Sequence, residues 1–255
     1  MIQINRAKVV IPNSLVKPNN QFRENDYKKT DVRSAMKTMQ YHKCCYCERN
    51  LKKEDEIEKE GEHFIPRSSD AHKVGGIKQW HLVNNWNNLM LSCRACNGTK
   101  LAKPPFDNQG VRQIIDPSDL TIDPENEIKF NLKIDIHSEY DLINSTVLGV
   151  STINKIGLYK RTFLRGKFRK IRALINGLFD DLITEIENED QDSINQILNN
   201  IRDYSKASKS HSAFCRAVIE DRLLKLNLTD IPFLANRHGI IINPINIQLH
   251  TGYDD

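Results

Sequence analysis

The chain has 255 residues, of which 39% are hydrophobic and 27% charged, and its formal net charge is +4 at pH 7. The composition is that of a globular protein, the length suits one large domain or two smaller ones, and the absence of an apolar run of about 18 residues argues against a membrane-spanning helix and a membrane partner. The first residues lack the apolar region of a secretory signal, so we expect a cytoplasmic location, and the weak positive charge allows an anionic partner without indicating one.

The N-terminal part predicts a strand, an extended lead-in and one helix. Within residues 1–29, short apolar runs alternate with prolines, which is typical of extended structure. Residues 30–42 predict a helix, because Thr30–Asp31 can cap it and three apolar side chains recur at the spacing of one helical face. These side chains are Val32, Met36 and Met39.

The next stretch predicts two strands followed by a helix. One strand is expected around His63 and another over residues 78–83, and Gly75–Gly76 supplies turn chemistry before the second strand. A helix is expected from about Cys93 to Ala102. The predicted order is therefore β, β, α.

The second half predicts one strand and three helices. Residues 127–137 alternate apolar and polar side chains with period two, which favours a strand. A helical region is expected to open at Ser151–Thr152 and to contain a long amphipathic helix of roughly 25 to 30 residues. Asp192–Ser193 is expected to cap a second helix, and residues 214–224 indicate a third. The apolar face of the long helix consists of Leu164, Phe168, Ile171, Ile175, Leu178, Phe179, Leu182 and Ile186.

The first half of the long helix is basic, and the sequence leaves two interpretations of it open. A basic helix end can bind a phosphate backbone without reading its sequence. The same charges can form a solvated face that keeps the helix soluble. The residues are Lys160, Arg161, Arg165, Lys167, Arg169, Lys170 and Arg172.

Four of the six cysteines form two Cys-x-x-Cys pairs, which are Cys44 with Cys47 and Cys93 with Cys96. This spacing lets two thiolates from one tight turn bind a tetrahedral Zn²⁺. The 45 residues between the pairs exceed the spacer of a simple zinc ribbon, so a structural zinc is expected to hold together the two ends of an inserted structure. A redox Cys-x-x-Cys is the alternative, but it needs only one pair beside a βαβ pattern. Cys45 and Cys215 are expected to be buried thiols.

An acidic residue and a histidine, Glu62 and His63, lie between the cysteine pairs. Adjacent side chains in a strand point to opposite faces, so both can reach one site only where the strand ends, and Pro66 suits such an exit. A lone Glu-His pair is usually two unrelated surface residues. His72 and His81 are expected to be exposed or structural, rather than further ligands.

The joint pattern resembles the HNH nuclease family, which has a ββα-metal fold and cuts nucleic acid. The resemblance rests on Glu62-His63-Phe64-Ile65-Pro66, on Asn88-Leu89, and on Cys93-x-x-Cys96-Asn97-x-x-Lys100. It implies that His63 is the general base that deprotonates the attacking water. It also implies that Glu62 and Asn97 hold one catalytic Mg²⁺ or Mn²⁺, that Asn88 braces the loop bearing His63, and that Lys100 touches a phosphate oxygen.

Those residue types suit the implied chemistry. A neutral imidazole accepts a proton near pH 7, and a hard cation with oxygen ligands neutralises charge that builds on the phosphate. Two positions depart from the commonest pattern of the family. Asn97 stands where many members carry a histidine, and Glu62 stands where aspartate is frequent, which lengthens the side chain by one methylene.

A narrower resemblance is to the HNH subunit of Septu antiphage systems, which is also found beside retrons. It is carried by Cys-x-Tyr-Cys-Glu, Glu-His-Phe-x-Pro, Trp-x-Asn-Leu and Cys-x-x-Cys-Asn-x-x-Lys. It implies an ABC or SMC-like ATPase as partner and nucleic acid as substrate, with DNA expected and RNA or tRNA left open.

The expected fold class is α+β, with a zinc-pinned ββα-metal core followed by a mainly α-helical C-terminal domain. The predicted domains are a nuclease domain over 1–115, a connecting segment with a strand over 116–150, a helical domain for partner docking over 151–226, and a tail over 227–255. The expected function is that of a metal-dependent HNH endonuclease. The alternative is a zinc-containing nucleic-acid-binding or scaffold module without turnover, which would need the cysteines but not Glu62, His63 and Asn97 together.

Overall fold

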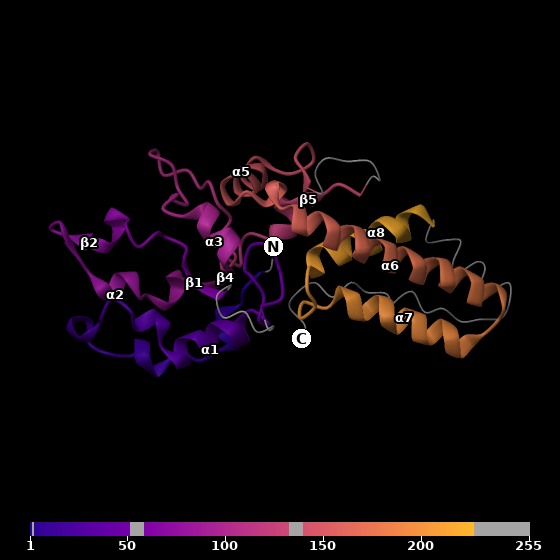
Figure 1. The fold of residues 1–255 in the computed structure, drawn as a ribbon, viewed down its shortest axis with the longest axis horizontal. Coiled ribbons are helices and arrows are strands. Elements are labelled where there is room, and N and C mark those ends of the chain that lie inside the picture. The colour runs from indigo at the N-terminus through magenta and orange to yellow at the C-terminus, as the bar shows by residue number, and fades with distance from the viewer. Residues whose placement is uncertain (2, 52–58, 133–139, 227–255) are drawn as a thin grey trace. The chain divides into compact units, whose positions relative to one another are not determined.

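The computed structural model describes residues 1, 3–51, 59–132 and 140–226 (Figure 1). The described residues form a mixed α+β protein with small sheets and a helical C-terminal region, as the sequence predicts in outline. They divide into two compact units. The first combines Met1–Lys129 with Tyr140–Lys160, and the second contains the described residues of 130–139 and 161–255. No helix among the described residues combines the length and the apolarity needed to span a membrane.

The first unit contains short helices and strands joined by 3-10 turns. Among its described residues the α-helices are α1 (Thr30–Met39), α2 (Trp80–Val83), α3 (Arg94–Lys100), α4 (Pro124–Glu127) and α5 (Val147–Ile156). In the described part of the chain the strands form three two-stranded sheets, which pair β1 (Lys59–His63) with β4 (Leu89–Cys93), β2 (Lys73–Val74) with β3 (Ile77–Lys78), and β5 (Lys129–Phe130) with β6 (Tyr140–Asp141). The described 3-10 helices are Arg6–Lys8, Asn13–Leu15, Asn19–Gln21, Asp26–Lys28, Asp70–His72, Trp86–Asn88 and Leu158–Lys160.

The N-terminal segment differs from the prediction in detail. The described part of residues 1–29 has 3-10 turns where a strand was expected, and prolines precede two of those turns. Helix α1 buries Val32, Met36 and Met39 as predicted. Its cap differs, because Thr30 is already the first helical residue, while Asp31 accepts a hydrogen bond from the backbone of Ser14 at 2.8 Å.

The β1–β4–α3 succession is the part of the fold that positions the candidate site (Figure 1). β1 and β4 pair antiparallel, with Lys59 opposite Cys93 and His63 opposite Leu89. The second strand of this succession is therefore not residues 78–83, as the sequence predicted, because those residues split into β3 and α2. All five residues of β4 are buried, so this mostly apolar strand lacks the alternating pattern of a half-covered strand.

Helix α3 is shorter than predicted and starts directly from β4. Cys93 is its N-cap, and the backbone N–H of Cys96 donates to its Sγ at 3.4 Å. The helix ends at Lys100 because Leu101 has a φ of +46°, which a right-handed helix cannot continue. The predicted turn at Gly75–Gly76 is confirmed: both glycines have positive φ, of +57° and +80°, and they join β2 to β3.

Helix α5 packs against α3 within the first unit. It begins at Val147 and not at Ser151–Thr152, because the hydroxyl of Thr146 accepts from the backbone N–H of Gly149 at 3.1 Å and caps it there. A Cβ on Gly149 would lie 1.9 Å from the carbonyl oxygen of Glu127, so the helix requires glycine at this close approach. Residues 151–160, which the sequence assigned to a helical domain, lie in the first unit.

The described residues of the second unit pack three helices together, α6 (Thr162–Glu187), α7 (Gln191–Ser205) and α8 (Ser212–Lys225). The predicted apolar face of α6 is confirmed, because all its members but Leu178 are buried. Since α6 packs against both α7 and α8, these helices cover that face. The cap of α7 lies earlier than predicted, at Asp190, whose carboxylate accepts from the backbone of Asp192 and Ser193 at 3.1 Å each.

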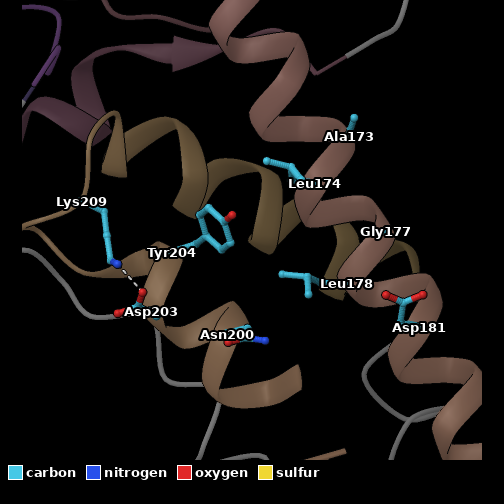
Figure 2. Close-up of a pocket in the computed structure, with 9 residues that line it drawn as sticks. All are labelled: Ala173, Leu174, Gly177, Leu178, Asp181, Asn200, Asp203, Tyr204 and Lys209. Carbon is cyan, nitrogen blue, oxygen red and sulfur yellow. Dashed lines mark ion pairs between the residues drawn. The ribbon is translucent and has the colours of Figure 1, made fainter. Parts of the chain in front are cut away.

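A hollow of about 580 Å³ lies between α6 and α7 (Figure 2). Leu174 and Leu178 line it from α6, and Tyr204 lines it from α7. A Cβ on Gly177 would meet no atom within 4 Å, so the missing side chain keeps the α6 wall open. An ion pair between Asp203 and Lys209 lies at its edge.

The predicted strand over 127–137 is only partly described. In the described part, Glu127 ends α4 and the strand is limited to Lys129–Phe130, while residues 133–137 lie outside the described residues. The predicted tail at 227–255 also lies outside them.

Candidate metal centre and active site

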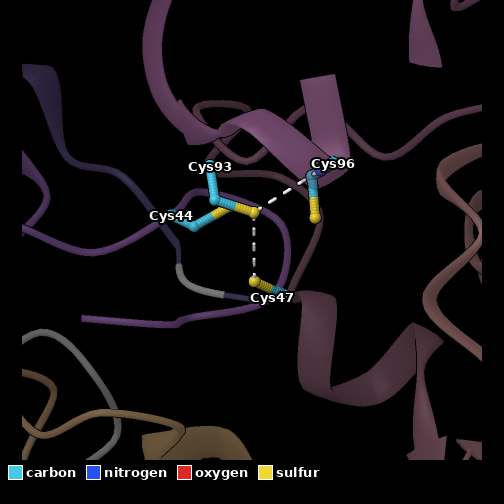
Figure 3. Close-up of side chains that lie close together, drawn as sticks. All are labelled: Cys44, Cys47, Cys93 and Cys96. Carbon is cyan, nitrogen blue, oxygen red and sulfur yellow. Dashed lines mark hydrogen bonds between the residues drawn. The ribbon is translucent and has the colours of Figure 1, made fainter. Parts of the chain in front are cut away.

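The four cysteines of the two Cys-x-x-Cys pairs meet in one buried cluster (Figure 3). Their sulfur atoms all lie within 4.8 Å of one another, and the Sγ atoms of Cys47 and Cys93 are 3.8 Å apart. A tetrahedral Zn²⁺ with Zn–S bonds near 2.3 Å places its sulfurs about 3.8 Å apart, so the donor set fits the ion in type, number and spacing. The cluster is consistent with the predicted structural zinc, and its four thiols disfavour a single redox pair.

Backbone contacts shape the first pair and tie it to the second. The backbone N–H of Glu48 donates to the carbonyl of Cys44 at 3.0 Å, and Glu48 has a φ of +58°, which closes the turn. The N–H of Cys45 donates to the carbonyl of Leu91 in β4 at 3.0 Å. The cluster therefore joins the chain before β1 to the β4–α3 junction. Cys45 itself is buried outside the cluster, as is Cys215, and both are confirmed as buried thiols.

Glu62 and Lys100 form a buried ion pair. The Nζ of Lys100 lies 2.7 Å from Oε1 of Glu62, and it also donates to the backbone carbonyl of His63 at 2.9 Å. The hydroxyl of Tyr46 donates to the same Oε1 at 3.1 Å. Burial raises the pKa of Glu62, while Lys100 and Tyr46 oppose that rise. The resemblance to HNH nucleases implied a metal contact for Glu62 and a phosphate contact for Lys100. In the structure the two side chains form an ion pair with each other.

We predict that Lys100→Met destabilises the first unit by about 3–5 kcal/mol, because it leaves the Glu62 carboxylate buried without its cation. The change is measured by urea unfolding followed by circular dichroism. The double variant Glu62→Gln with Lys100→Met is the control, and it should recover most of the loss because no unpaired charge remains. A Lys100→Met variant as stable as the wild type would contradict a stabilising ion pair.

His63 ends β1, and the residue is only 6% exposed. Its ring meets the ring of Tyr27 edge to face, with centroids 4.6 Å apart. Among the described residues its Nε2 has no hydrogen-bond partner, although that atom is shielded from solvent. Burial, first of all, and then electrostatic repulsion from Arg67, His72 and Lys100 together lower the pKa of His63 to about 3. The imidazole is therefore neutral across the physiological range, in the form that can accept a proton.

We predict a pH signature for this buried imidazole. The folded-state pKa lies below the value of 6.5 for a free histidine, so the unfolded chain binds the proton first as the pH falls. The free energy of unfolding should therefore decrease from about pH 6.5 downward, and His63 should account for about 2 kcal/mol of that decrease by pH 5. The measurement compares urea unfolding of the wild type and of His63→Gln at pH 8, 6.5 and 5. Equal slopes in the two proteins would show that His63 is not buried as a neutral group.

Asn88 holds the loop that follows His63. Its side-chain Oδ1 accepts from the backbone N–H of Ile65 at 2.6 Å, and its Nδ2 donates to the carbonyl of Ile65 at 3.1 Å. Its own carbonyl accepts from the N–H of Phe64 at 3.0 Å. His72 also reaches this loop, with Nε2 at 3.3 Å from the Ile65 carbonyl. His72 is buried, which agrees with the structural role expected for it.

Asn97 lies on α3 one helical turn before Lys100. Residues three apart on a helix share a face, so Asn97 lies on the side of α3 that faces β1 through Lys100. Its side chain is half-buried. Lys100 thus contacts Glu62 and the backbone of His63 at the end of β1, Asn88 holds the loop that follows His63, and Asn97 lies on the adjoining helical face.

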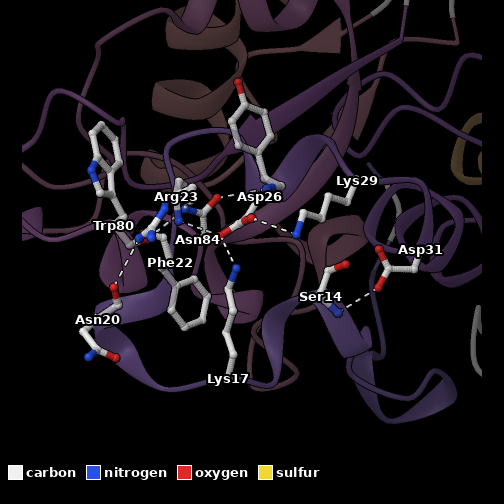
Figure 4. A network of polar contacts seen from close by, with 11 residues as sticks. Ser14, Lys17, Asn20, Phe22, Arg23, Asp26, Lys29, Asp31, Trp80 and Asn84 are labelled. Atoms are coloured by element: carbon white, nitrogen blue, oxygen red, sulfur yellow. Dashed lines mark hydrogen bonds and ion pairs between the residues drawn. The ribbon is translucent and has the colours of Figure 1, made fainter.

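Two neighbours of His63 were not predicted from the sequence, Tyr27 and Arg67. Tyr27 comes from the N-terminal segment, and a Cβ on Gly61 of β1 would lie 2.9 Å from its ring, so a glycine before Glu62 admits it. A polar network fixes this segment (Figure 4): Asn84 accepts from the backbone N–H of Tyr27 at 3.0 Å and donates to the carbonyl of Arg23 at 2.9 Å. The one feature of the local sequence that could have indicated this contact is Gly61, the glycine directly before Glu62.

The network also contains a buried carboxylate, that of Asp26 (Figure 4). Lys17 binds it at 2.5 Å, and Lys29 at 3.2 Å. The backbone N–H of Arg23 donates to it at 2.6 Å. These contacts hold the 3-10 turn that presents Tyr27 to His63.

Two curated proteins resemble this chain. It is 33% identical to the Septu protein PtuB of Bacillus thuringiensis over 127 residues, which are 49% of this chain and 42% of that protein. It is 35% identical to the Septu protein PtuB of Bacillus mycoides strain KBAB4 over 95 residues, 34% of this chain and 30% of that protein. These matches confirm the resemblance to Septu proteins, although each covers less than half the length of the relative. No family model and no solved structure matches the chain.

Proposed function

We propose that the chain is a metal-dependent HNH endonuclease that hydrolyses phosphodiester bonds of DNA. The observation that carries this proposal is the position of the His63 imidazole beside the Glu62–Lys100 ion pair, at the end of a strand that pairs with β4 and packs against α3. The four-cysteine cluster lies at the ends of the same elements, as expected of a zinc-pinned ββα-metal core. The motifs that resemble HNH nucleases thus converge in space.

Glu62 and Asn97 would hold the catalytic Mg²⁺ or Mn²⁺, because a carboxylate and an amide oxygen are donors that these ions accept. Among the described residues, the contacts of Glu62 with Lys100 and Tyr46 both fall on Oε1, so Oε2 is the oxygen that would face the ion. A bound ion would neutralise charge on the phosphate and on the departing 3′ oxygen.

His63 acts as the general base in this proposal. It removes a proton from a water whose oxygen bonds to phosphorus, while the bond from phosphorus to the 3′ oxygen breaks. Asn88 positions His63 by fixing Ile65 on both backbone groups. Lys100, whose ammonium is buried, positions Glu62 and the carbonyl of His63. We therefore assign Lys100 to positioning, in place of the phosphate contact expected from the sequence.

The test is cleavage by the purified chain with Mg²⁺ or Mn²⁺, with and without its proposed ATPase partner, on plasmid, linear duplex DNA and RNA. We expect cut DNA, and chelation of the added divalent ion should stop the reaction while zinc stays bound. Cleavage of RNA alone would correct the substrate. No cleavage of any substrate under these conditions would contradict an endonuclease.

We further propose that the chain is the effector of a Septu-type antiphage system and acts with an ABC or SMC-like ATPase. The similarity to Septu proteins PtuB supports this assignment. The apolar face of α6 is covered by α7 and α8, so docking by the helical unit has to use its outer surface. Its described exposed apolar residues include Phe163, Leu174 and Leu224.

We predict that a chain ending at Lys160 keeps its zinc but does not co-purify with the ATPase. A chain ending at Asp116 is a poor test of docking because it also removes α5, where the hydroxyl of Thr152 accepts from the buried backbone N–H of Ile115 at 2.9 Å. The measurement is pull-down of the tagged ATPase, together with the zinc content of each chain. Equal capture by the 160-residue chain and the full chain would place docking in the first unit.

A zinc-containing scaffold without turnover remains the second candidate. The observation that favours it is the Glu62–Lys100 ion pair, which satisfies the acidic residue of the motif without any metal. A scaffold would bind nucleic acid equally well with His63 or with glutamine at that position and would cleave with neither.

A further inference from the structure

Arg67 lies four residues after His63, at the other end of a loop whose backbone is held by hydrogen bonds. Asn88 bonds both backbone groups of Ile65 in this loop, and His72 contacts the carbonyl of Ile65 from another side. Phe64 and Pro66 are buried. The separation of Arg67 from His63 is therefore set by the fold, as a preorganised site requires.

Tyr27 contacts both side chains. Its ring packs against the imidazole of His63, with centroids 4.6 Å apart. The guanidinium carbon of Arg67 lies 5.3 Å from the centre of the same ring, and Nη1 of Arg67 donates to the tyrosine hydroxyl at 3.2 Å. One buried aromatic ring thus holds a base and a permanent cation as neighbours.

Both groups leave a nitrogen unused. Among the described residues, Nε of Arg67 and Nε2 of His63 have no hydrogen-bond partner, although both atoms are shielded from solvent. Buried polar groups are nearly always bonded, so two such atoms on adjoining side chains point to a group that binds there.

Glu24 is the carboxylate that contacts this guanidinium. Its Oε1 lies 2.5 Å from Nη2 of Arg67, and the Glu24 side chain is 56% exposed. An exposed ion pair adds little stability, so an incoming anion can replace the carboxylate. A phosphodiester presents two oxygens to a guanidinium in the same planar geometry as a carboxylate does.

We propose that Arg67 binds a non-bridging oxygen of the phosphodiester attacked beside His63, and that Glu24 holds the guanidinium in place until the substrate arrives. This inference rests on the proposed nuclease function. Arg67 forms and breaks no covalent bond; it stabilises the negative charge that increases on the phosphate as the water adds.

The experiment compares full-length Arg67→Ala, Arg67→Lys, Glu24→Ala and Lys28→Ala with the wild type on duplex DNA in Mg²⁺, with single-turnover rates measured. Arg67→Ala should cleave about 10²-fold or more slowly. Arg67→Lys should recover part of the rate, because lysine restores the positive charge but not the planar pair of N–H donors of the guanidinium. Lys28 also lies over the Tyr27 ring, at 5.6 Å, so Lys28→Ala is the matched control for a lost cation and should cleave as the wild type does.

The Glu24→Ala variant distinguishes two roles of Arg67: binding a phosphate of the substrate, or supporting the fold through its ion pair with Glu24. We expect it to cleave at least as fast as the wild type, because Arg67 no longer has to be released. If Glu24→Ala loses as much activity as Arg67→Ala, the ion pair is structural and the proposal is overturned. The proposal is also overturned if Arg67→Ala cleaves within about twofold of the wild-type rate. Removal of one preorganised hydrogen-bond donor is expected to lower the rate by far more, about 10²-fold.

Failure of the nuclease assignment has a separate readout. If the wild type cleaves no nucleic acid, duplex binding is compared by fluorescence anisotropy in the His63→Gln background, with and without Arg67→Ala. At least tenfold weaker binding with Arg67→Ala would support the phosphate contact even without turnover. Unchanged binding would overturn it.

Discussion

Replacing His63 with alanine is expected to lower the cleavage rate by about 10²- to 10⁴-fold, the range that a positioned general base contributes. The physical reason is that His63 lies at the end of β1 beside the ion pair of Glu62 and Lys100, and its imidazole is neutral and can accept a proton. The measurement is the single-turnover rate on the preferred substrate at saturating Mg²⁺. Retained activity would remove His63 from the mechanism.

The structure changes how this experiment has to be controlled. His63 is packed against Tyr27 rather than exposed, so alanine also leaves a cavity and lowers stability. His63→Gln keeps more of the volume and serves as the second variant. His81, on α2 with its ring 6.5 Å from that of Phe22, provides the control for loss of a histidine in the same unit. We expect His81→Ala to cleave normally.

Replacing Cys93 with serine is expected to unfold the first unit or to cause aggregation, with less than half an equivalent of zinc bound. A closed thiolate site contributes directly to folding free energy. Cys93 has three tasks: its sulfur belongs to the four-cysteine cluster, its backbone pairs with Lys59 at the end of β4, and its side chain caps α3. The loss therefore reaches the strand, the helix and the metal together.

Metal analysis by mass spectrometry and far-ultraviolet circular dichroism check this prediction. Cys45→Ala is the matched control, because Cys45 is buried next to the cluster without being one of the four cysteines. It should keep a full equivalent of zinc. A Cys93→Ser chain with full zinc content and native circular dichroism would contradict a structural zinc that holds the two segments together.

Short-range patterns in the sequence were sufficient for several elements. The Cys-x-x-Cys spacing predicted which sulfurs cluster, the three- and four-residue repeat predicted α6, and Gly75–Gly76 predicted the β2–β3 turn. In each case the physical cause acts within a few residues: ligand spacing, helical period or a backbone that needs positive φ. Such features can be read without knowing how distant segments meet.

The contacts that define the candidate site depend on segments far apart in the chain. Leu89–Cys93 became the partner of β1 in place of residues 78–83, because a fully buried strand has no alternating pattern to reveal it. Glu62 pairs with Lys100, which lies on a helix 38 positions later, and this pairing gives Lys100 a positioning role in place of the expected phosphate contact. Residue types indicated the chemistry of the site, but only the packing of β1, β4, α3 and the Tyr27 turn decided which charges are buried together. Which charges are buried together depends on the desolvation of each group in the folded chain, and the spacing of residues along the sequence does not give this information.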